Sequence, residues 1–223
     1  MLKIERAITP SSEWWEEVVL GARNAYGSWE KSDSYWGWDD ENKPKFIIGK
    51  NDLTLLSSLS NGGDDHGKYL RQLPVICRIT APHFWWPEMD QYKIGTVTNS
   101  CSKMHTLLNK PFEASDFTME SILTVASRDS IIEHLNYMRD LYFKYEDPYT
   151  KKQIWRGILE QLPLCYNQMR TWSANYQVLK RIYYARKDHK LPEWHQFCDW
   201  ILTLPYTKEL FHIEDNDEQT AST

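Results

Sequence analysis

Two polar residues, Asn175 and Arg186, stand eleven positions apart in the stretch from Trp172 to Trp200. In a helix, at about 100° per residue, this spacing puts both side chains on nearly the same face, roughly 16 Å apart. A carboxamide and a guanidinium in this arrangement can hold a single long ligand. Asparagine is a poor helix-interior residue, which favours a ligand role for Asn175. Arg186 could instead pair with Asp188 or with the C-terminal end of the helix, where cations are favourable.

A pair of helices would position these two residues. Pro192 is typical of the first turn of the second helix. On pattern alone, the pair is an ordinary helical hairpin with polar surface groups. The apolar residues at helical spacing are Tyr176, Leu179, Ile182 and Tyr183 in the first helix and Trp194, Phe197, Trp200 and Ile201 in the second.

Composition limits the class of protein. The 223-residue chain has a formal charge of -5 and therefore no basic footprint for duplex nucleic acid. Its 11 tryptophans and 13 tyrosines favour a large core or an oligomer interface, although aromatic residues also build pockets for flat ligands. Four widely spaced cysteines without a secretory signal lead us to expect reduced thiols and a cytoplasmic location. No apolar run approaches the ~20 residues of a membrane span, so no membrane partner is expected.

The N-terminal half predicts both strands and helices. Residues 2–8 and 73–81 are expected to form strands, and residues 9–13 carry a helix-start signal. Residues 28–45 read as a long polar loop, which three tryptophans mark as packed down or functional. Asn51 is expected to cap a second helix.

The rest of the chain predicts mainly helices. Residues 127–146 and 149–161 have apolar side chains at helical spacing. Residues 94–106 are small and polar and are expected to form a loop and a helical turn that contact ligands. Residues 214–223 are acidic and polar and are expected to be a disordered tail.

Several kinds of site are poorly supported. His189, Glu193 and His195 lie near one another, but they lack the spacing of a zinc site and are better explained as solvated polar groups. The chain contains no phosphate-cradling glycine loop of the P-loop or dinucleotide type. No metal is therefore predicted.

Several short segments resemble the flavin-dependent thymidylate synthases. At the C-terminal end these are Asn175, Leu179 and Arg186, together with the pair Glu193-Trp194. At the N-terminal end they are Ile8-Thr9-Pro10, Ala22-Arg23 and Tyr26, followed by His66 after an acidic turn and by Ala81-Pro82. The resemblance extends over most of the chain.

The chain departs from the signature of that family. The family has Arg-His-Arg, seven residues and then Ser, with Asn-Glu inside and Arg-Tyr after it. The matching triplet here is Tyr92-Lys93-Ile94, or Gln91-Tyr92-Lys93 with a one-residue shift. Asn99 and Ser102 fit, whereas Ser100 replaces the glutamate and Met104 the nucleotide-binding arginine. Lysine can supply charge but not the planar fork of arginine, so the groups around the nucleotide have been rewritten.

The resemblance implies reductive methylation of dUMP, with FAD, NADPH and methylenetetrahydrofolate as cofactors. In such an enzyme the flavin does the chemistry, and no catalytic side-chain nucleophile is required. The implied cofactor-binding residues are His66, Tyr92, Lys93, Asn99 and Asn175. The implied substrate-binding residues are Ser100, Ser102, Lys103, Arg156 and Arg186, with Arg156 standing in for a family arginine whose place Leu159 takes. Taken without the resemblance, His66 is a solvated turn residue, Asn99 and Ser102 are turn formers, and the others are surface groups.

The expected architecture is α+β, with a small central sheet and several long helices in a single domain over residues 1–213. By resemblance it is a homotetramer with sites between subunits, which would bury surplus tryptophans. The favoured function is one-carbon transfer to C5 of a pyrimidine deoxynucleotide. One alternative is a hydroxymethylase on the same fold, and the other is a non-catalytic nucleotide-binding protein that has lost flavin.

Overall fold

The computed structural model describes residues 2–213, so the predicted tail at 214–223 lies outside the described residues. Contacts group these residues into two compact units. Unit 1 consists of residues 2–5, 78–92 and 98–171, and unit 2 consists of residues 6–77, 93–97 and 172–213. The mixture of helices with a small sheet confirms the predicted α+β class.

A four-stranded sheet has the order β1-β4-β6-β5. Its strands are β1 (Lys3–Ile8), β4 (Pro74–Pro82), β5 (Val97–Ser100) and β6 (Asn167–Asn175). The strands predicted at 2–8 and 73–81 are confirmed as β1 and β4. β5 occupies part of the stretch that was predicted to be a loop, and the helical turn predicted after it is α4 (Lys103–Thr106).

The prediction that Asn175 lies within a helix is wrong, because β6 continues to that residue. Gln168, Trp172 and Ala174 are buried at even spacing, which is the period of a strand and not of a helix. Asn175 has an extended backbone (φ -127°, ψ 170°) and caps α7 (Tyr176–Arg186), its side chain accepting a hydrogen bond from Val178 N. Its poor propensity for helix interiors is therefore explained by a capping role.

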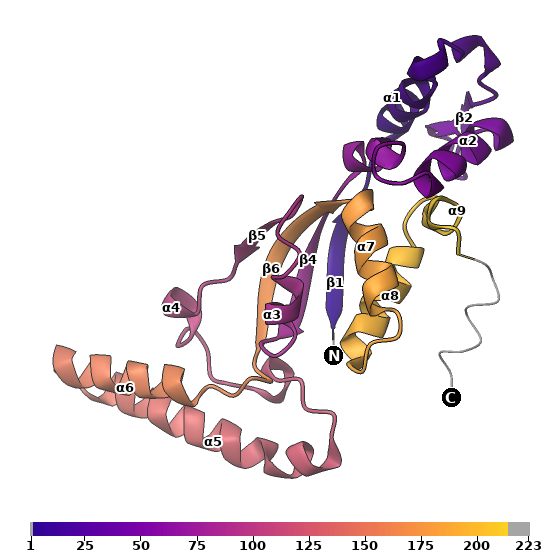
Figure 1. The fold of residues 1–223 in the computed structure, drawn as a ribbon. Helices are drawn as coiled ribbons and strands as arrows, with labels where there is room; N and C mark the ends of the chain where they lie inside the picture. The colour runs from indigo at the N-terminus through magenta and orange to yellow at the C-terminus, as the bar shows by residue number, and fades with distance from the viewer. Residues whose placement is uncertain (1, 214–223) are drawn as a thin grey trace. The chain divides into compact units, whose positions relative to one another are not determined.

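Unit 1 contains the two longest helices, α5 (Ile122–Lys144) and α6 (Pro148–Gln161), which lie side by side (Figure 1). They confirm the helices predicted at 127–146 and 149–161. The Asp147 side chain caps α6 by accepting from Thr150 N at 2.7 Å. The buried cluster between and beside these helices consists of Leu107, Phe112, Phe117, Leu135 and Ile158. Unit 1 also contains the short helix α3 (Trp86–Met89).

Unit 2 is built around aromatic side chains. It contains α1 (Ser12–Arg23), α2 (Lys50–Asn61), α7, α8 (Pro192–Leu202) and α9 (Thr207–Phe211). Trp15 of α1 lies edge-on to Tyr176 of α7 with ring centroids 5.7 Å apart, and Tyr176 in turn meets Phe211 of α9. The helices predicted after residue 9 and from Pro192 are confirmed.

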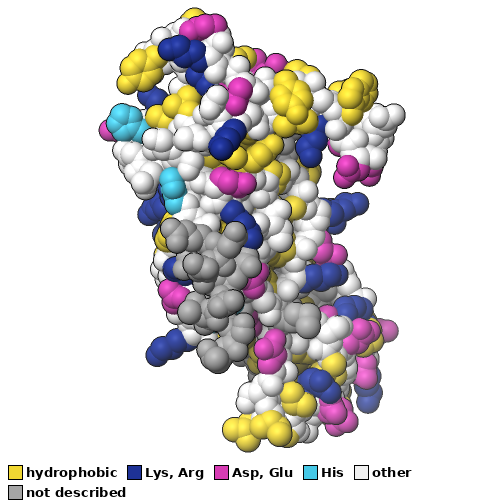
Figure 2. All heavy atoms as spheres, turned by 90° about the vertical axis from the view of Figure 1, so that its right-hand side faces the viewer, with side chains coloured by type: hydrophobic (Ala, Val, Ile, Leu, Met, Phe, Trp, Pro, Cys, Tyr) yellow, Lys and Arg dark blue, Asp and Glu magenta, His cyan; other side chains and the backbone are white. Residues whose placement is uncertain are grey.

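The loop predicted over residues 28–45 is wrong in part, because it contains a hairpin. β2 (Tyr35–Trp38) pairs antiparallel with β3 (Pro44–Ile47), and Tyr35 stands opposite Ile47. Trp29, Trp36 and Trp38 are 52%, 42% and 68% exposed, so none of the three is in the core. Figure 2 shows hydrophobic side chains at the surface near its top, at the height of α1 and β2 in Figure 1.

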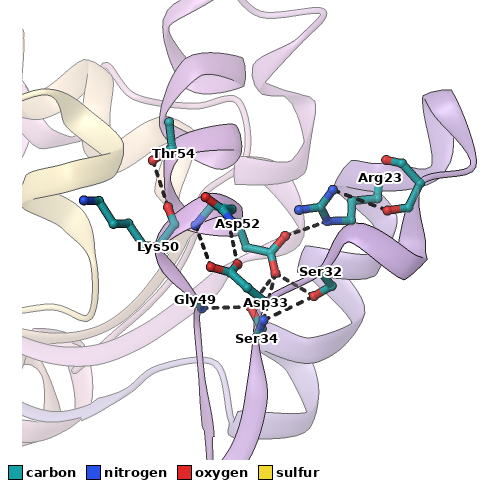
Figure 3. A network of polar contacts seen from close by, with 10 residues as sticks. Arg23, Ser32, Asp33, Ser34, Gly49, Lys50, Asp52 and Thr54 are labelled. Atoms are coloured by element: carbon teal, nitrogen blue, oxygen red, sulfur yellow. Dashed lines mark hydrogen bonds and ion pairs between the residues drawn. The ribbon is translucent and has the colours of Figure 1, made fainter.

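A buried polar network joins this hairpin region to α2 (Figure 3). Asp52 is fully buried and accepts from Arg23 Nε at 2.6 Å and from the hydroxyls of Ser32 and Ser34 at 2.6 Å each. Asp33 accepts from the backbone N–H groups of residues 51 and 52 and so caps α2. The prediction that Asn51 caps this helix is wrong, because a carboxylate distant in sequence satisfies the free N–H groups.

The remaining sequence features can be stated briefly. The four cysteines are free thiols. Within residues 2–213, no helix is long and apolar enough to cross a membrane, and no group of three or more His, Cys, Asp or Glu side chains could hold a metal ion.

Candidate functional site

A cavity of about 560 Å³ lies in unit 2, within the size range of small-molecule and cofactor pockets. One wall is the outward face of α7, and the other is the end of α2 with the turn that follows it. The lining residues are Ser60, Asn61, Gly63, Asp64, Gly67, Leu70, Gln177, Lys180, Arg181, Tyr184 and Ala185.

The polar groups of this cavity are held in place by hydrogen bonds. Lys180 Nζ donates to the backbone oxygen of Ser60 at 2.9 Å and to its hydroxyl at 2.8 Å. Gln177 Nε2 donates to Asp64 Oδ1 at 2.9 Å. Burial lowers the pKa of Lys180, while the charge of Asp64 acts in the opposite direction. Arg181 is exposed and forms no ion pair with a residue that the structure describes.

Two cations, Lys180 and Arg181, and one carboxylate, Asp64, give the cavity a net positive charge, which suits an anionic ligand such as a phosphate group. Tyr184 adds an aromatic surface that is 47% exposed. The arrangement can therefore bind a ligand that combines negative charge with a flat ring.

None of the ten residues predicted from the sequence lines this cavity. His66 is the nearest along the chain, since it stands between the lining residues Asp64 and Gly67, and its side chain is exposed. A signal for the lining residues was nevertheless present. Gln177, Lys180, Arg181 and Tyr184 follow the spacing i, i+3, i+4, i+7, and they form the polar complement of the apolar stripe of α7.

Asn175 and the rewritten signature meet in unit 2. Gly95, in the segment between Lys93 and β5, has φ +79°, a conformation that favours glycine. A Cβ atom on Gly95 would lie 3.1 Å from Asn175 Nδ2 and 3.1 Å from Val178 Cγ2. The segment after Lys93 therefore packs closely against the start of α7, and the carboxamide of Asn175 is engaged by the helix on one side and this loop on the other.

Arg186, at the last turn of α7, is oriented by a tryptophan. Its guanidinium carbon lies 4.7 Å from the ring centroid of Trp194, a fully buried residue of α8. A guanidinium on the face of an indole keeps its planar donors in a fixed orientation and remains charged. The resemblance includes both Arg186 and Trp194 as separate positions, and the structure brings them into contact.

If Arg186 contacts a pyrimidine nucleotide, as the resemblance implies, replacing it with alanine should weaken binding of that nucleotide by about 1.5–3 kcal/mol, the loss expected when a charge-assisted hydrogen bond is removed. Isothermal titration calorimetry with dUMP measures this change. Thermal unfolding of the variant checks that the lost contact with Trp194 has not unfolded α8. Unchanged affinity in a folded variant would remove Arg186 from the binding site.

The other predicted residues lie mostly in unit 1. Asn99 and Ser100 belong to β5 and are exposed, Ser102 precedes α4, and Tyr92 is partly buried after α3. Arg156 of α6 is exposed and pairs with Glu160 at 2.7 Å, one turn along the helix. In that pair, Nε of Arg156 is bonded to the Glu160 carboxylate. An exposed ion pair of this type contributes little to stability.

Lys103 has different surroundings from these exposed groups. It is partly buried at the first position of α4, and its Nζ lies 3.0 Å from Nε2 of His83. The imidazole of His83 stacks on Tyr166, with ring centroids 6.0 Å apart and an interplanar angle of 9°. His83 was not singled out from the sequence, where a single histidine after Ala81-Pro82 gave no pattern.

Solved structures that superpose on this chain include flavin-dependent thymidylate synthases and a UMP/dUMP methylase. Thymidylate synthase X from Helicobacter pylori, with FAD and dUMP, superposes with a TM-score of 0.65 at 17% identity, over 95% of this chain and 97% of that one. A second structure of that enzyme with FAD and dUMP gives 0.64 at 15% identity, over 94% and 97%. The UMP/dUMP methylase PolB from Streptomyces cacaoi, bound to 5-bromo-dUMP, gives 0.61 at 14% identity, over 95% of both chains.

No protein-family model and no curated protein sequence matches the chain. The chain has the fold of these flavin-dependent thymidylate synthases over nearly its whole length, at a sequence identity of 15–17%. The fold predicted from the short segments of resemblance is confirmed.

Proposed function

We propose that the chain is a divergent enzyme of the flavin-dependent thymidylate synthase type, which binds FAD and transfers a one-carbon unit to C5 of a pyrimidine deoxynucleotide. dUMP is the substrate we favour, methylenetetrahydrofolate the one-carbon donor and NADPH the reductant. The proposal is supported most by the cavity along α7, whose positive wall and aromatic group are suited to a nucleotide cofactor.

The lining of the cavity suits the chemistry of FAD in two respects. The pyrophosphate of FAD needs cationic donors, which Lys180 and Arg181 can supply, and its ring systems need a flat surface, which the exposed ring of Tyr184 can supply. When bound, the flavin would supply the hydride chemistry that no side chain can perform. The residues of this chain would bind and orient the cofactor and exclude water from one of its faces.

The substrate would be held by groups outside this cavity. Arg186, stacked on Trp194, is the cation we assign to the pyrimidine nucleotide, and Asn175 fixes the start of the helix that carries it. We also propose the homotetramer implied by the resemblance, which multi-angle light scattering would test as a mass four times that of the chain.

The visible absorption spectrum of the purified protein, before and after addition of FAD and then dUMP, tests the proposal. We expect a bound-flavin spectrum that dUMP perturbs, because the two ligands would meet in one site. A colourless protein that takes up no flavin would contradict the redox mechanism and would favour the alternative of a nucleotide-binding protein without flavin.

Product analysis separates the two enzymatic versions of this proposal. Incubation with dUMP, methylenetetrahydrofolate and NADPH should give dTMP by mass spectrometry if the one-carbon unit is fully reduced. The hydroxymethyl product would arise if the same unit is transferred and captured by water without reduction. The altered signature, with Ser100 and Met104 in place of glutamate and arginine, is the feature that favours testing both.

A further inference from the structure

Three basic side chains meet in unit 1 at adjacent strands of the sheet. His83 directly follows β4, Arg170 lies within β6, and Lys103 begins α4 three residues after β5 ends. The strand order places β6 between β4 and β5. Three segments that are distant in sequence thus bring two cations and an imidazole to one place.

His83 is a neutral imidazole here. Burial, the positive charge of Lys103 and the positive charge of Arg170 lower the pKa of His83 to about 4. Its Nε2 accepts a hydrogen bond from Lys103 Nζ at 3.0 Å, so the proton of the neutral ring is assigned to Nδ1. The ring is held flat against Tyr166 and is a fixed acceptor for Lys103.

Three contacts, made by Nη1, by Nε and by the face of the guanidinium, hold Arg170 in place. Its Nη1 pairs with Asp90 at 2.8 Å, its Nε donates to Gln168 Oε1 at 3.1 Å, and its guanidinium carbon lies 4.1 Å from the ring centroid of Trp86. Only 12% of its side chain is exposed. Its Nη2 makes no hydrogen bond to any residue between 2 and 213, so one edge of the guanidinium is left for another acceptor.

The charges in this cluster do not balance. Asp90 pairs with Arg170, whereas Lys103 has no ion pair with a carboxylate in the described part of the chain. Burial and then the charge of Arg170 lower the pKa of Lys103, which means that its charged form is disfavoured where it stands. Lys110, in the same unit, shows the ordinary arrangement, since it pairs with Asp116 at 2.9 Å.

We propose that His83, Lys103 and Arg170 form an oxyanion site that binds a phosphate group. A phosphate placed among them would compensate the charge of Lys103 and accept from its ammonium and from Nη2 of the Arg170 guanidinium, whose planar donors match a phosphate. Lys103 provides the charge that Met104 does not, and Arg170 provides the planar fork that the altered signature lacks. Only the assignment of this phosphate to the nucleotide substrate rests on the proposed function.

Titration of the full chain with inorganic phosphate, followed by NMR of the histidine ring resonances, tests the site without any assumption about the substrate. A saturable shift of His83 is expected, with no comparable shift of His134, whose exposed ring bonds to Gln161 of α6. Lys103→Met should weaken the phosphate response by about tenfold or more, because a charge-assisted bond is lost. The matched variant Lys110→Met should leave it within about twofold, since that lysine is already paired.

Calorimetry with dUMP and with deoxyuridine then identifies the phosphate. In the wild type, dUMP should bind at least tenfold more tightly than deoxyuridine, and Lys103→Met should remove most of that difference while leaving deoxyuridine binding unchanged. Absence of a phosphate response at His83, or an equal response in Lys103→Met, would overturn the site. A phosphate response in a protein that binds neither dUMP nor flavin would support the site and reject the proposed function.

Discussion

Replacing Asp52 with alanine should lower the free energy of unfolding by about 3–5 kcal/mol, because it leaves a buried cation without its partner. Asp52 is fully buried, and the Arg23 side chain that pairs with it is 7% exposed. The hydroxyls of Ser32 and Ser34 would lose their acceptor at the same time (Figure 3). Urea unfolding of the wild type and of Asp52→Ala measures the change.

Two further variants sharpen this test. Asp40→Ala removes an exposed carboxylate from the hairpin turn and should change stability by no more than about 0.5 kcal/mol. The double variant Arg23→Met with Asp52→Leu removes both charges and should recover part of the loss, since apolar residues often replace a buried ion pair without cost. A loss under about 1 kcal/mol in Asp52→Ala would show that the network contributes little.

The same network predicts a dependence on pH. Burial alone would raise the pKa of Asp52, but the hydrogen bonds from Ser32 and Ser34 and the guanidinium of Arg23 outweigh burial and lower it. A folded-state pKa below the unfolded one stabilises the fold above the unfolded pKa, and this contribution is lost as the pH falls through the folded pKa. The stability difference between the wild type and Asp52→Ala should therefore narrow below about pH 4.

The helices of this chain were predictable from the sequence. Strand β6, and the candidate site on helix α7 that follows it, were only partly predictable. Apolar spacing locates α5, α6 and α8 because each buries one stripe and leaves the rest to solvent. The same reasoning placed Asn175 inside a helix. The helical pattern of apolar residues begins with Tyr176 and Leu179 directly after Asn175, whereas Asn175 itself is the last residue of strand β6. Strand β6 alternates at a period of two, which a search for helical spacing does not detect.

Some residues of the candidate sites can be found from a local sequence pattern, and others only from the way the chain folds. The lining residues on α7 could have been found from the polar face of that helix, since Gln177, Lys180 and Arg181 follow one spacing. The His83–Lys103–Arg170 cluster could not, because its members come from three strands or their ends and meet only through the sheet order. The hydrogen bonds of Asp33 and Asp52 could not be predicted from local sequence either. Asp33 bonds to the backbone of residue 52, which is 19 residues away, and Asp52 bonds to Arg23, which is 29 residues away.

Reversing the charge of Arg181 should have the largest effect on the proposed flavin site. Arg181→Glu places a second carboxylate in a cavity whose other wall already contains Asp64, so FAD affinity should fall by about tenfold to a hundredfold. Lys190→Glu makes the same change of charge at an exposed position outside the cavity and should leave FAD affinity within about twofold. Flavin fluorescence quenching measures both. Equal losses in the two variants would indicate a general effect of net charge, whereas a loss confined to Arg181→Glu would assign the outward face of α7 to the flavin.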